Sequence, residues 1–469
     1  MSMSGSAIEK EKKNRVIILT DIEADPDDTQ SLVRLFLYAN EIDIKGIVAT
    51  TSFWRRDKVE TPFIRKVIRA YGKVQPNLLR HDEGYPSEQA LMDVVKDGTP
   101  KYGMLAVGNG QASEGSEWIV QELEKADERP LWISVWGGAN TLAQALDKLK
   151  ETKSRKELKR LVSMLRVYAI SDQDDAGIWI RNNFPDLFYI VSPGGYTEDV
   201  TWRGINQVVE GNDNSEISNS WLAENIQQAH GPLGAAYPDV SWGMEGDTPA
   251  FLHLIPNGLN VPEHPEWGGW GGRYLLYRPD IPKEGKGKSI IEISPETRPI
   301  WTNASDTYKP FSYRDYSRPV GRDTVSFTGN SVSLWRWRDD FQNDFAARMD
   351  WCLQSYAEAN HPPVPVLACE DHLTVKPGTV VFLDASDSVD PDGDHLSFLW
   401  FNYPEAGSLK AEPEIIGADN THALFLSIPE VDKKGSIHMI LRLTDKGRPS
   451  LSRYKRITID IEPDATSAN

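Results

Sequence analysis

The sequence predicts an α/β domain built on a mostly parallel sheet, followed by a smaller all-β sandwich. Three observations support this prediction. From Val16 onward, short apolar runs alternate with amphipathic stretches. A proline-rich segment, His361–Pro365, ends this alternation, and short strand-like runs separated by turn residues follow it. The chain has 469 residues, which is more than one ordinary domain holds. We therefore expect one domain over residues 14–360 and a second over residues 366–463.

The first domain should contain parallel strands covered by helices on both faces. Strand-helix alternation of this kind is typical of such sheets, and their ligands bind beyond the carboxyl ends of the strands. Functional residues are therefore sought in the loops after Thr20, Val135 and Ile170. The predicted strands are Val16–Leu19, Ile42–Thr50, Leu131–Val135 and Arg166–Ile170, and the predicted helices are Thr29–Ala39 and Thr61–Tyr71.

Two later segments of the first domain differ in character. Gly204–Arg322 is rich in Trp, Pro, Gly and Asn and weakly periodic, which indicates functional loops or lids. A helix-like run, Trp335–Ala357, should close the domain. Its charged face is expected to contact either solvent or the second domain. That face consists of Arg336, Arg338, Asp339, Asp340 and Asp344.

The second domain has the pattern of a small immunoglobulin-like β-sandwich. Its turn Asp384–Asp394, followed by a run ending at Trp400, resembles polycystic-kidney-disease and related immunoglobulin-like modules appended to extracellular glycosidases. We expect the polyproline-type linker to be cut in limited proteolysis. The predicted strands are Thr379–Leu383, Leu396–Phe401, His438–Leu443 and Arg456–Ile461.

The composition of the chain limits the classes of partner that we expect it to bind. A net charge of −18 disfavours nucleic acid, whose phosphates need clustered Lys and Arg, and suits a neutral sugar or a cation. No apolar stretch approaches the length of a membrane span, so no membrane partner is expected. Cys352 and Cys369 form either one bridge or two separate thiols. The N-terminus lacks an apolar signal region, so the protein is intracellular or a secreted protein whose signal is missing from this sequence; we prefer secretion. The oligomeric state stays open, a homo-oligomer included.

The loop after the first strand carries five carboxylates within eight residues: Asp21, Glu23, Asp25, Asp27 and Asp28. One carboxylate at a helix N-terminus is an ordinary cap, but five cannot all be caps. Massed carboxylates raise each other's pKa unless a cation neutralises them. Ca²⁺ takes six to eight oxygen ligands, and without nearby His or Cys zinc is disfavoured. A solvated acidic turn is the alternative.

This strand-loop-helix segment resembles the hallmark of the inosine-uridine nucleoside hydrolases, Asp-x-Asp-Pro-Gly-x-Asp-Asp. The resemblance implies that Glu23 and Asp28 bind calcium and that Asp27 binds the sugar and activates the attacking water. Glu23 replaces an Asp of the family, so its neighbour Asp25 is an alternative ligand.

Two further segments resemble the same family. Val135–Ala143 is similar to its Gly-rich strand end, which implies that the Trp136 carbonyl reaches the metal. Glu245–Ala250 is similar to its last ligand element, which implies that Asp247 binds calcium. The family's leaving-group His falls on Gly246. We also predict substrate contacts by Asn140, Glu245 and Asp174, although Asp174 could instead cap a helix.

Two functions follow from these expectations. The first is a calcium-dependent glycosidase, acting on a furanosyl or other sugar, in which Asp27 accepts the proton of the attacking water. An O-linked leaving group fits better than a purine, because the leaving-group His is missing. The alternative is a non-catalytic carbohydrate-binding protein, of cellulose or another plant glycan, in which Trp267, Trp270 and Trp301 stack on the sugar. The resemblance extends to a divergent branch that pairs such a domain with a C-terminal sandwich and has been labelled cellulose-binding.

Overall fold

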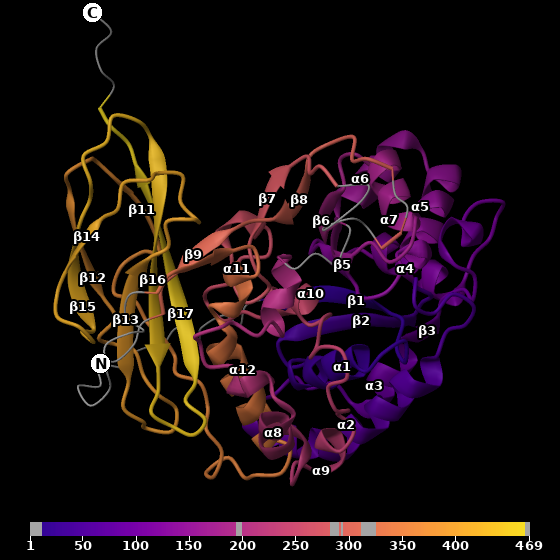
Figure 1. Cartoon of the computed structure of the whole chain (residues 1–469), viewed down its shortest axis with the longest axis horizontal. Helices are drawn as coiled ribbons and strands as arrows, with labels where there is room; N and C mark the ends of the chain where they lie inside the picture. Colours follow the sequence, from indigo (N-terminus) through magenta and orange to yellow (C-terminus); the bar gives the residue numbers. More distant parts are fainter. Residues whose placement is uncertain (1–11, 194–198, 282–289, 292–293, 311–324, 465–469) are drawn as a thin grey trace, which may run out of the picture.

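The computed structural model describes residues 12–193, 199–281, 290–291, 294–310 and 325–464. Its first part is an eight-stranded sheet in the order β3-β2-β1-β4-β5-β6-β8-β7 (Figure 1). Neighbouring strands are parallel except for β7, which runs antiparallel to β8. The prediction of a mostly parallel sheet is therefore confirmed. The strands are β1 Asn14–Thr20, β2 Ile42–Ala49, β3 Val95–Asp97, β4 Leu131–Val135, β5 Leu165–Ser171, β6 Phe188–Ser192, β7 Tyr274–Tyr277 and β8 Ile300–Asn303.

Helices cover both faces of this sheet, because the apolar side chains of its central strands alternate between two cores. On β1, Val16 and Ile18 pack in one core with α1 and α2, whereas Ile17 and Leu19 pack in the other with α4 and α5. The helices are α1 Asp27–Leu37, α2 Thr61–His81, α3 Glu88–Asp93, α4 Glu114–Glu124, α5 Asn140–Thr152, α6 Arg155–Ser163, α7 Ala176–Asn183, α8 Asn219–Leu222, α9 Gly231–Gly234, α10 Pro249–Leu252, α11 Val332–Trp335 and α12 Arg338–Asp350. Single helical turns lie at Gly103–Ala106, Thr201–Ile205, Ser215–Ile217, Ala223–Gln227 and Pro265–Trp267.

The strand order reverses between β1 and β4. From β1 the chain moves outward through β2 to β3, and from β4 it moves the other way through β5 to β6. At such a switch point the two connecting loops diverge and leave a crevice at the carboxyl ends of the strands. The acidic loop follows β1 and the Gly-rich segment follows β4, so both lie at this crevice.

The second part is a sandwich of two sheets. One sheet has the order β11-β17-β16-β13, and the other has the order β12-β15-β14. Their facing side chains form a separate apolar core that includes Leu383, Leu426, Met439 and Ile457. The strands are β11 His372–Val375, β12 Val380–Asp384, β13 Ser397–Asn402, β14 Glu414–Ile416, β15 Ala423–Ser427, β16 Gly435–Thr444 and β17 Ser452–Ile461; a ribbon of β9 Asp306–Tyr308 and β10 Phe327–Gly329 lies nearby (Figure 1).

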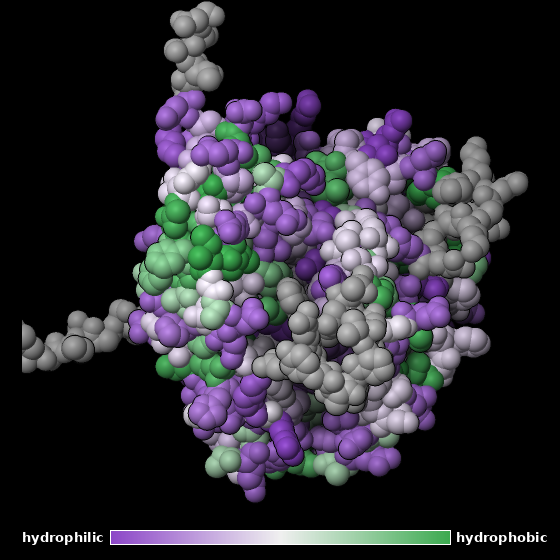
Figure 2. All heavy atoms as spheres, turned by 60° about the vertical axis from the view of Figure 1, so that its left-hand side comes forward, coloured by the Kyte–Doolittle hydropathy of each residue, from purple (hydrophilic) through white to green (hydrophobic). Residues whose placement is uncertain are grey.

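The outer face of the β12-β15-β14 sheet is apolar and exposed. Phe382 on β12 and Phe425 on β15 are directly paired, with ring centroids 5.0 Å apart, and both rings are about half exposed. Val380 and Ile416 are exposed beside them. Figure 2, in which the sandwich side of the molecule comes forward, shows apolar residues in green among hydrophilic ones.

The inner sheet of the sandwich shares a core with the first domain. Phe401, Tyr403 and Tyr454 belong to the same buried cluster as Trp337 and Phe341. The rings of Trp337 and Tyr454 meet edge to face at 5.7 Å. The sandwich thus has its own core between its two sheets and also packs one face of the β11-β17-β16-β13 sheet against the α/β domain.

Buried polar contacts reinforce this interface. On α12, Asp340 accepts hydrogen bonds from Tyr454 and Arg442, and Asp344 accepts one of 2.7 Å from Arg453. The charged face of this helix was expected to contact either solvent or the second domain. For Asp340 and Asp344 the contact with the second domain is correct. The predicted helix Trp335–Ala357 is shorter in the structure, ending at Asp350.

The linker is buried at His361 and Pro363, whereas Val364 is exposed. His361 is 4% exposed, and its ring stacks on the rings of Tyr356 and Trp351, with centroids 3.8 Å and 5.1 Å away. Its ring nitrogens contact His81 at 3.0 Å and Asp392 at 3.0 Å. Burial disfavours a protease cut at His361, since a protease needs an accessible, mobile backbone, and the cut expected in this linker stays a prediction.

Cys352 is buried and Cys369 half-buried, and both are free thiols, so the two-thiol alternative is correct. Most of Gly204–Arg322 is loop with single helical turns, and residues 282–289, 292–293 and 311–322 lie outside the described residues. Among the described residues, no helix combines the length and apolarity needed to cross a bilayer.

Candidate functional site: an acidic pocket at the switch point

A small pocket opens at the crevice between β1 and β4. The volume open to water-sized molecules in it is about 30 Å³. Six parts of the sequence meet in it: the acidic loop, the loop after β2, the end of β4, the end of β5, the turn Thr201–Ile205 and the loop before α10. Its lining consists of Asp21, Asp25, Asp27, Asp28, Trp54, Trp136, Ile170, Ser171, Gln173, Trp202, Gly246 and Asp247.

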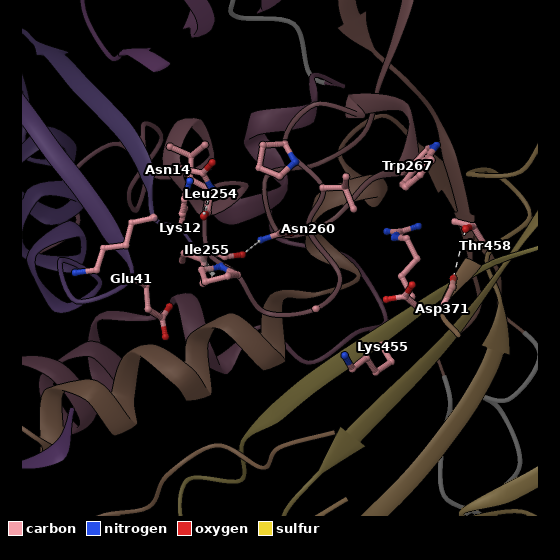
Figure 3. Close-up of a pocket in the computed structure, with 16 residues that line it drawn as sticks. Lys12, Asn14, Glu41, Leu254, Ile255, Asn260, Trp267, Asp371, Lys455 and Thr458 are labelled. Atoms are coloured by element: carbon pink, nitrogen blue, oxygen red, sulfur yellow. Dashed lines mark hydrogen bonds between the residues drawn. The ribbon is translucent and has the colours of Figure 1, made fainter. Parts of the chain in front are cut away.

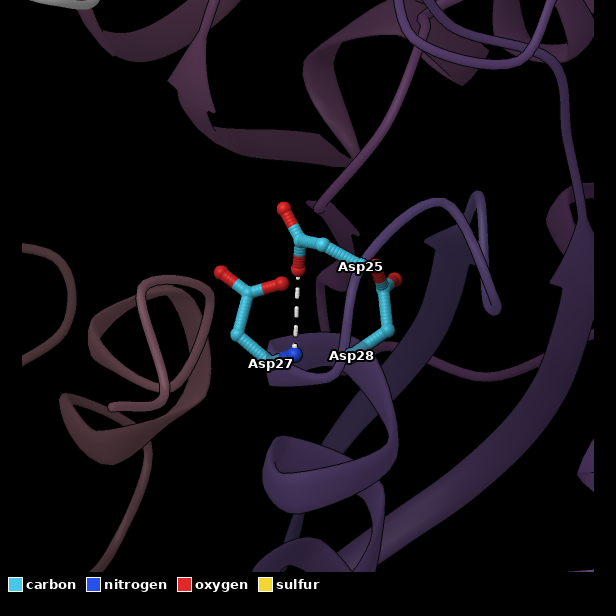
Figure 4. A group of neighbouring side chains, drawn as sticks. All are labelled: Asp25, Asp27 and Asp28. Atoms are coloured by element: carbon cyan, nitrogen blue, oxygen red, sulfur yellow. Dashed lines mark hydrogen bonds between the residues drawn. The ribbon is translucent and has the colours of Figure 1, made fainter. Parts of the chain in front are cut away.

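Three carboxylates of the acidic loop converge above the first turn of α1 (Figure 4). Asp25, Asp27 and Asp28 each offer an oxygen, and these oxygens lie within 4.8 Å of one another. The Asp27 backbone N–H donates to Asp25 Oδ1 at 3.1 Å, and the Thr20 hydroxyl donates to Asp28 Oδ1. The loop therefore holds these carboxylates together by its own hydrogen bonds.

A further carboxylate comes from another segment. Asp247 is 4% exposed, and its Oδ2 is buried without a hydrogen-bond partner. An unpaired buried carboxylate oxygen is costly unless a cation balances it. All nearby donor atoms are oxygens of the type that Ca²⁺ or Mg²⁺ prefers. The residues of this pocket therefore fit a hard divalent cation.

Burial and mutual repulsion raise the pKa values of these carboxyls. Burial is the largest cause for Asp27, Asp28 and Asp247, whose pKa values are raised well above the usual range, with neighbouring aspartates raising each of them further. Burial also raises the pKa of Asp21 to about 6. Without a cation, these groups would hold protons that free aspartates have already released.

A pH dependence of stability follows. A carboxyl with a raised pKa binds a proton more tightly in the folded than in the unfolded state, so folding stability falls as pH rises through the interval between the two pKa values. For Asp21 this interval runs from 3.8 to about 6. In chelator, we expect the melting temperature to fall between about pH 4 and pH 7, and calcium to remove most of that fall. A calcium-insensitive pH profile would contradict a cation in this pocket.

Two glycines leave room for the acidic side chains. A Cβ on Gly137 would lie 2.6 Å from Asp21 Oδ1. A Cβ on Gly246 would lie 2.8 Å from Asp27 Oδ2 and 3.3 Å from the Trp202 ring. At the position that carries a His in the resembled family, any side chain would therefore have to displace the Asp27 carboxylate and press on Trp202.

Glu23 lies outside the cluster of carboxylates. It is exposed, and its backbone adopts a left-handed conformation with φ of 70°. Its carbonyl oxygen accepts a hydrogen bond from Arg55, which also pairs with Glu60 at 3.1 Å. Asp25 occupies the cluster instead. The structure thus favours Asp25 over Glu23, because the left-handed turn directs the chain away from the pocket at that residue.

The other predicted metal contacts line the pocket. Asp28, Asp247 and Trp136 are all part of its wall. The Trp136 carbonyl accepts a hydrogen bond from the Gln173 side chain. A carbonyl has a second lone pair, so this bond leaves one acceptor position on that oxygen.

The three predicted substrate contacts lie behind the pocket wall. Glu245 is fully buried in an ion pair with Arg34, Nε to Oε2 2.6 Å. Asn140 is fully buried and donates to Thr51 Oγ1 at 2.9 Å and to the Lys101 carbonyl at 2.8 Å. Both side chains are bonded within the protein and neither is among the lining residues of the pocket, so a sugar contact by either one stays a prediction that this geometry does not support.

Asp174 caps helices, which is the alternative to a substrate contact that the sequence left open for it. Its carboxylate accepts from the backbone N–H groups of Ala176 at 3.0 Å and Asn140 at 3.1 Å, which begin α7 and α5. It is 1% exposed, and burial raises its pKa to about 7. It therefore ties two helix starts together behind the pocket.

The structure adds aromatic residues that the sequence did not single out. Trp54 lines the mouth of the pocket and is 53% exposed, and Trp202 forms a buried wall. Trp54 follows β2, so the rule that ligands bind beyond strand ends could have found it. Of the tryptophans proposed for stacking, Trp270 is fully buried, and neither Trp267 nor Trp301 lines the acidic pocket.

A larger pocket lies between the two domains (Figure 3). Trp267, Glu41, Asp371 and Lys455 are among its lining residues. Positive and negative side chains are mixed along its wall, and no group of three metal-ligating side chains within the described residues lies there. The acidic pocket is the better functional candidate because its polar groups converge.

These features define a nucleoside-hydrolase-like α/β protein with an oxygen-rich pocket and a C-terminal sandwich. Residues 15–274 match the family model "Cellulose-binding Sde182, nucleoside hydrolase-like domain", and residues 380–461 match "Cellulose-binding protein Sde0182, C-terminal domain". The first match covers more than half of the chain, so the chain belongs to this family.

A solved relative agrees over nearly the whole length. It is a nucleoside hydrolase-related hypothetical protein from Saccharophagus degradans, associated with carbohydrate metabolism, with 37% identity and a TM-score of 0.80; the match covers 96% of this chain and 100% of that one. The effector protein XOO4466 matches at 10% identity and a TM-score of 0.33, over 62% of this chain and 87% of that one, a likeness too weak to bear on fold or function. No functionally curated protein matches the sequence.

Proposed function

We propose that this protein is a calcium-dependent glycoside hydrolase whose reaction takes place in the acidic pocket. The observation that carries the proposal is the cluster of Asp25, Asp27 and Asp28 in a pocket that Asp247 also lines, with a buried Asp247 Oδ2 that has no hydrogen-bond partner. Calcium bound there would hold two sugar hydroxyls and lower the pKa of a water molecule.

The residues of the pocket are assigned three roles: calcium binding, proton acceptance and contact with the sugar ring. Asp28 and Asp247, with Asp25 and the Trp136 carbonyl, are the proposed calcium ligands. Asp27 is the proposed general base, because it lies partly exposed at the start of α1, facing the pocket. Burial and the neighbouring aspartates raise the pKa of Asp27, and a bound cation would lower it, which leaves the carboxylate ionised and able to accept a proton. Trp202 and Trp54 offer apolar surfaces to the C–H face of a sugar ring.

The leaving group must depart without help from a side chain at position 246, because that residue is Gly. The Glu245 carboxylate is held by Arg34 and does not reach the pocket. Without an assigned protein acid to protonate the leaving group, a group that can depart as a stable anion is more compatible with this pocket than a purine.

Calcium binding is the first test of the proposal. A ligand that binds only the folded state at a hundred times its dissociation constant stabilises a protein by about 2.7 kcal/mol. We expect calcium to raise the melting temperature of the chelator-treated protein, and Asp28→Asn to reduce that rise strongly. Elemental analysis after dialysis should show one calcium per chain. Stoichiometric zinc, or no metal and no calcium effect, would contradict the scheme.

A non-catalytic carbohydrate-binding protein is the second candidate. The family description of the C-terminal domain and the exposed Phe382–Phe425 face favour it. This candidate predicts retention on insoluble cellulose without release of any sugar from a broad glycoside panel. The hydrolase predicts turnover of at least one glycoside that depends on calcium.

A further inference from the structure

The acidic pocket joins two segments that are far apart in the sequence. Asp27 and Asp28 begin α1, whereas Asp247 lies in the loop before α10. Hydrogen bonds within the acidic loop and to β1 position its carboxylates. The position of Asp247 relative to them depends instead on the contacts that hold the loop before α10 against α1. A shift of about 1 Å in one ligand is enough to weaken a preorganised site.

A buried ion pair spans these two segments. Arg34, about two turns along α1 from Asp27, pairs with Glu245, two residues before Asp247. The distances are 2.6 Å from Nε to Oε2 and 3.1 Å from Nη2 to Oε1, and both side chains are fully buried. The planar guanidinium thus meets both carboxylate oxygens, which fixes orientation as well as distance.

Both ends of the pair are fixed by further contacts. The Glu245 carboxylate accepts from the Tyr237 hydroxyl at 2.7 Å and from the Thr248 hydroxyl at 2.9 Å. Arg34 donates to the Gln342 side chain, and its guanidinium lies 4.0 Å from the centre of the Phe345 ring. The α12 helix therefore holds the arginine end.

A second bond ties the same loop to α1. The Glu245 backbone N–H donates to Gln30 Oε1 at 2.9 Å, and Gln30 Nε2 donates to the Pro238 carbonyl at 3.0 Å. Glu245 adopts a left-handed backbone with φ of 50°, which non-glycine residues adopt at some cost in free energy. The loop is thus held at Glu245 in a conformation that side-chain contacts must maintain.

We propose that Arg34 and Glu245 are a positioning pair that sets the distance between Asp247 and the Asp27–Asp28 end of α1, and thereby the affinity of the pocket for calcium. This inference rests on the proposed function. A buried ion pair adds little net stability, since desolvation offsets the attraction, so the geometry that it imposes is the better reason for its presence.

Arg34→Lys tests this role, because lysine keeps the charge but cannot meet two carboxylate oxygens and Gln342 together. Arg15→Lys is the matched control. Arg15 also forms a buried pair, with Glu122 at 3.3 Å, but it lies on β1 at the end opposite the acidic loop. Calcium affinity is measured by titration calorimetry on the full chain, at a temperature where all variants give native circular dichroism.

We expect the calcium dissociation constant to rise about tenfold in Arg34→Lys and to stay within about twofold of wild type in Arg15→Lys, even if both lose similar stability. Tyr237→Phe is a milder second variant, for which we expect a rise of about threefold. Tyr85→Phe, which loses a buried hydrogen bond to the Leu37 carbonyl, is its control.

The possible outcomes distinguish a failure of the positioning role from a failure of the proposed function. If wild type binds calcium but Arg34→Lys keeps its affinity, the positioning role is overturned and the proposed function stands. If Arg34→Lys does not fold, Tyr237→Phe decides the question in the same way. An equal loss in Arg15→Lys would also overturn the role, since general destabilisation would then explain it. If wild type binds no calcium, the proposed function falls and this inference falls with it.

Discussion

Asp27→Asn is expected to lower the rate of glycoside cleavage by about a hundredfold to ten-thousandfold, which is the typical cost of losing a general base. Asparagine keeps the size of the side chain but cannot accept the proton of the attacking water. Calcium should remain bound, because Asp25, Asp28 and Asp247 keep their charges. The measurement is turnover of a panel of furanosides, nucleosides and aryl glycosides, beside calcium content for each variant.

Two comparison variants sharpen this experiment. Asp28→Asn should lose calcium and activity together, because Asp28 is a proposed ligand. Asp93→Asn should resemble wild type, because Asp93 lies exposed on α3 and its carboxylate accepts a hydrogen bond from Gln89, far from the pocket lining. Equal turnover by wild type and Asp27→Asn on every cleaved substrate would remove Asp27 from the mechanism. A wild type that cleaves nothing yet binds cellulose would favour the second candidate.

Removal of the sandwich is expected to prevent the α/β domain from folding as a soluble unit. A chain ending at residue 360 would expose Trp270, Trp337 and Phe341, which are now at most 3% exposed. Exposing each such side chain costs about 1.5 to 3 kcal/mol, so several of them together approach the whole stability of a typical domain. We expect the shortened chain to be insoluble or to show no cooperative melting transition.

A point variant tests the same interface without truncation. Tyr454→Ala removes a fully buried ring that packs on Trp337 and donates to Asp340, and we expect a loss of about 3 to 5 kcal/mol. Phe425→Ala, on the exposed outer sheet, should change stability by less than about 1 kcal/mol. A soluble, cooperatively melting fragment 1–360 with wild-type calcium affinity would show that the sandwich is dispensable.

The fold class and the location of the site could both be predicted from the sequence alone. Buried parallel strands such as Leu131–Val135 are continuous apolar runs, and their pattern marks them without any tertiary information. Five carboxylates directly after such a strand indicate a cation site, because the carboxyl end of a central strand is where ligands bind. Asp27, Asp28 and Trp136 line the pocket for this reason, whereas Asp247, in the loop before α10, was predicted from the family resemblance.

Which polar residues face the pocket and which lie behind it depends on tertiary packing. Glu245, Asn140 and Asp174 are close in sequence to pocket residues, yet each is bonded to protein atoms behind the wall. Asp25 replaces Glu23 because a single left-handed residue turns the loop. Local spacing does not encode such orientations.

The interface between the domains is likewise a result of tertiary packing. The apolar alternation of β17 predicts a strand with buried faces, but not whether Tyr454 lies in the sandwich or against α12. A proline-rich linker is the same in sequence whether its flanking domains move freely or share a core. The buried His361 shows that here they share one, because apolar contacts between distant segments outweigh the freedom of the linker.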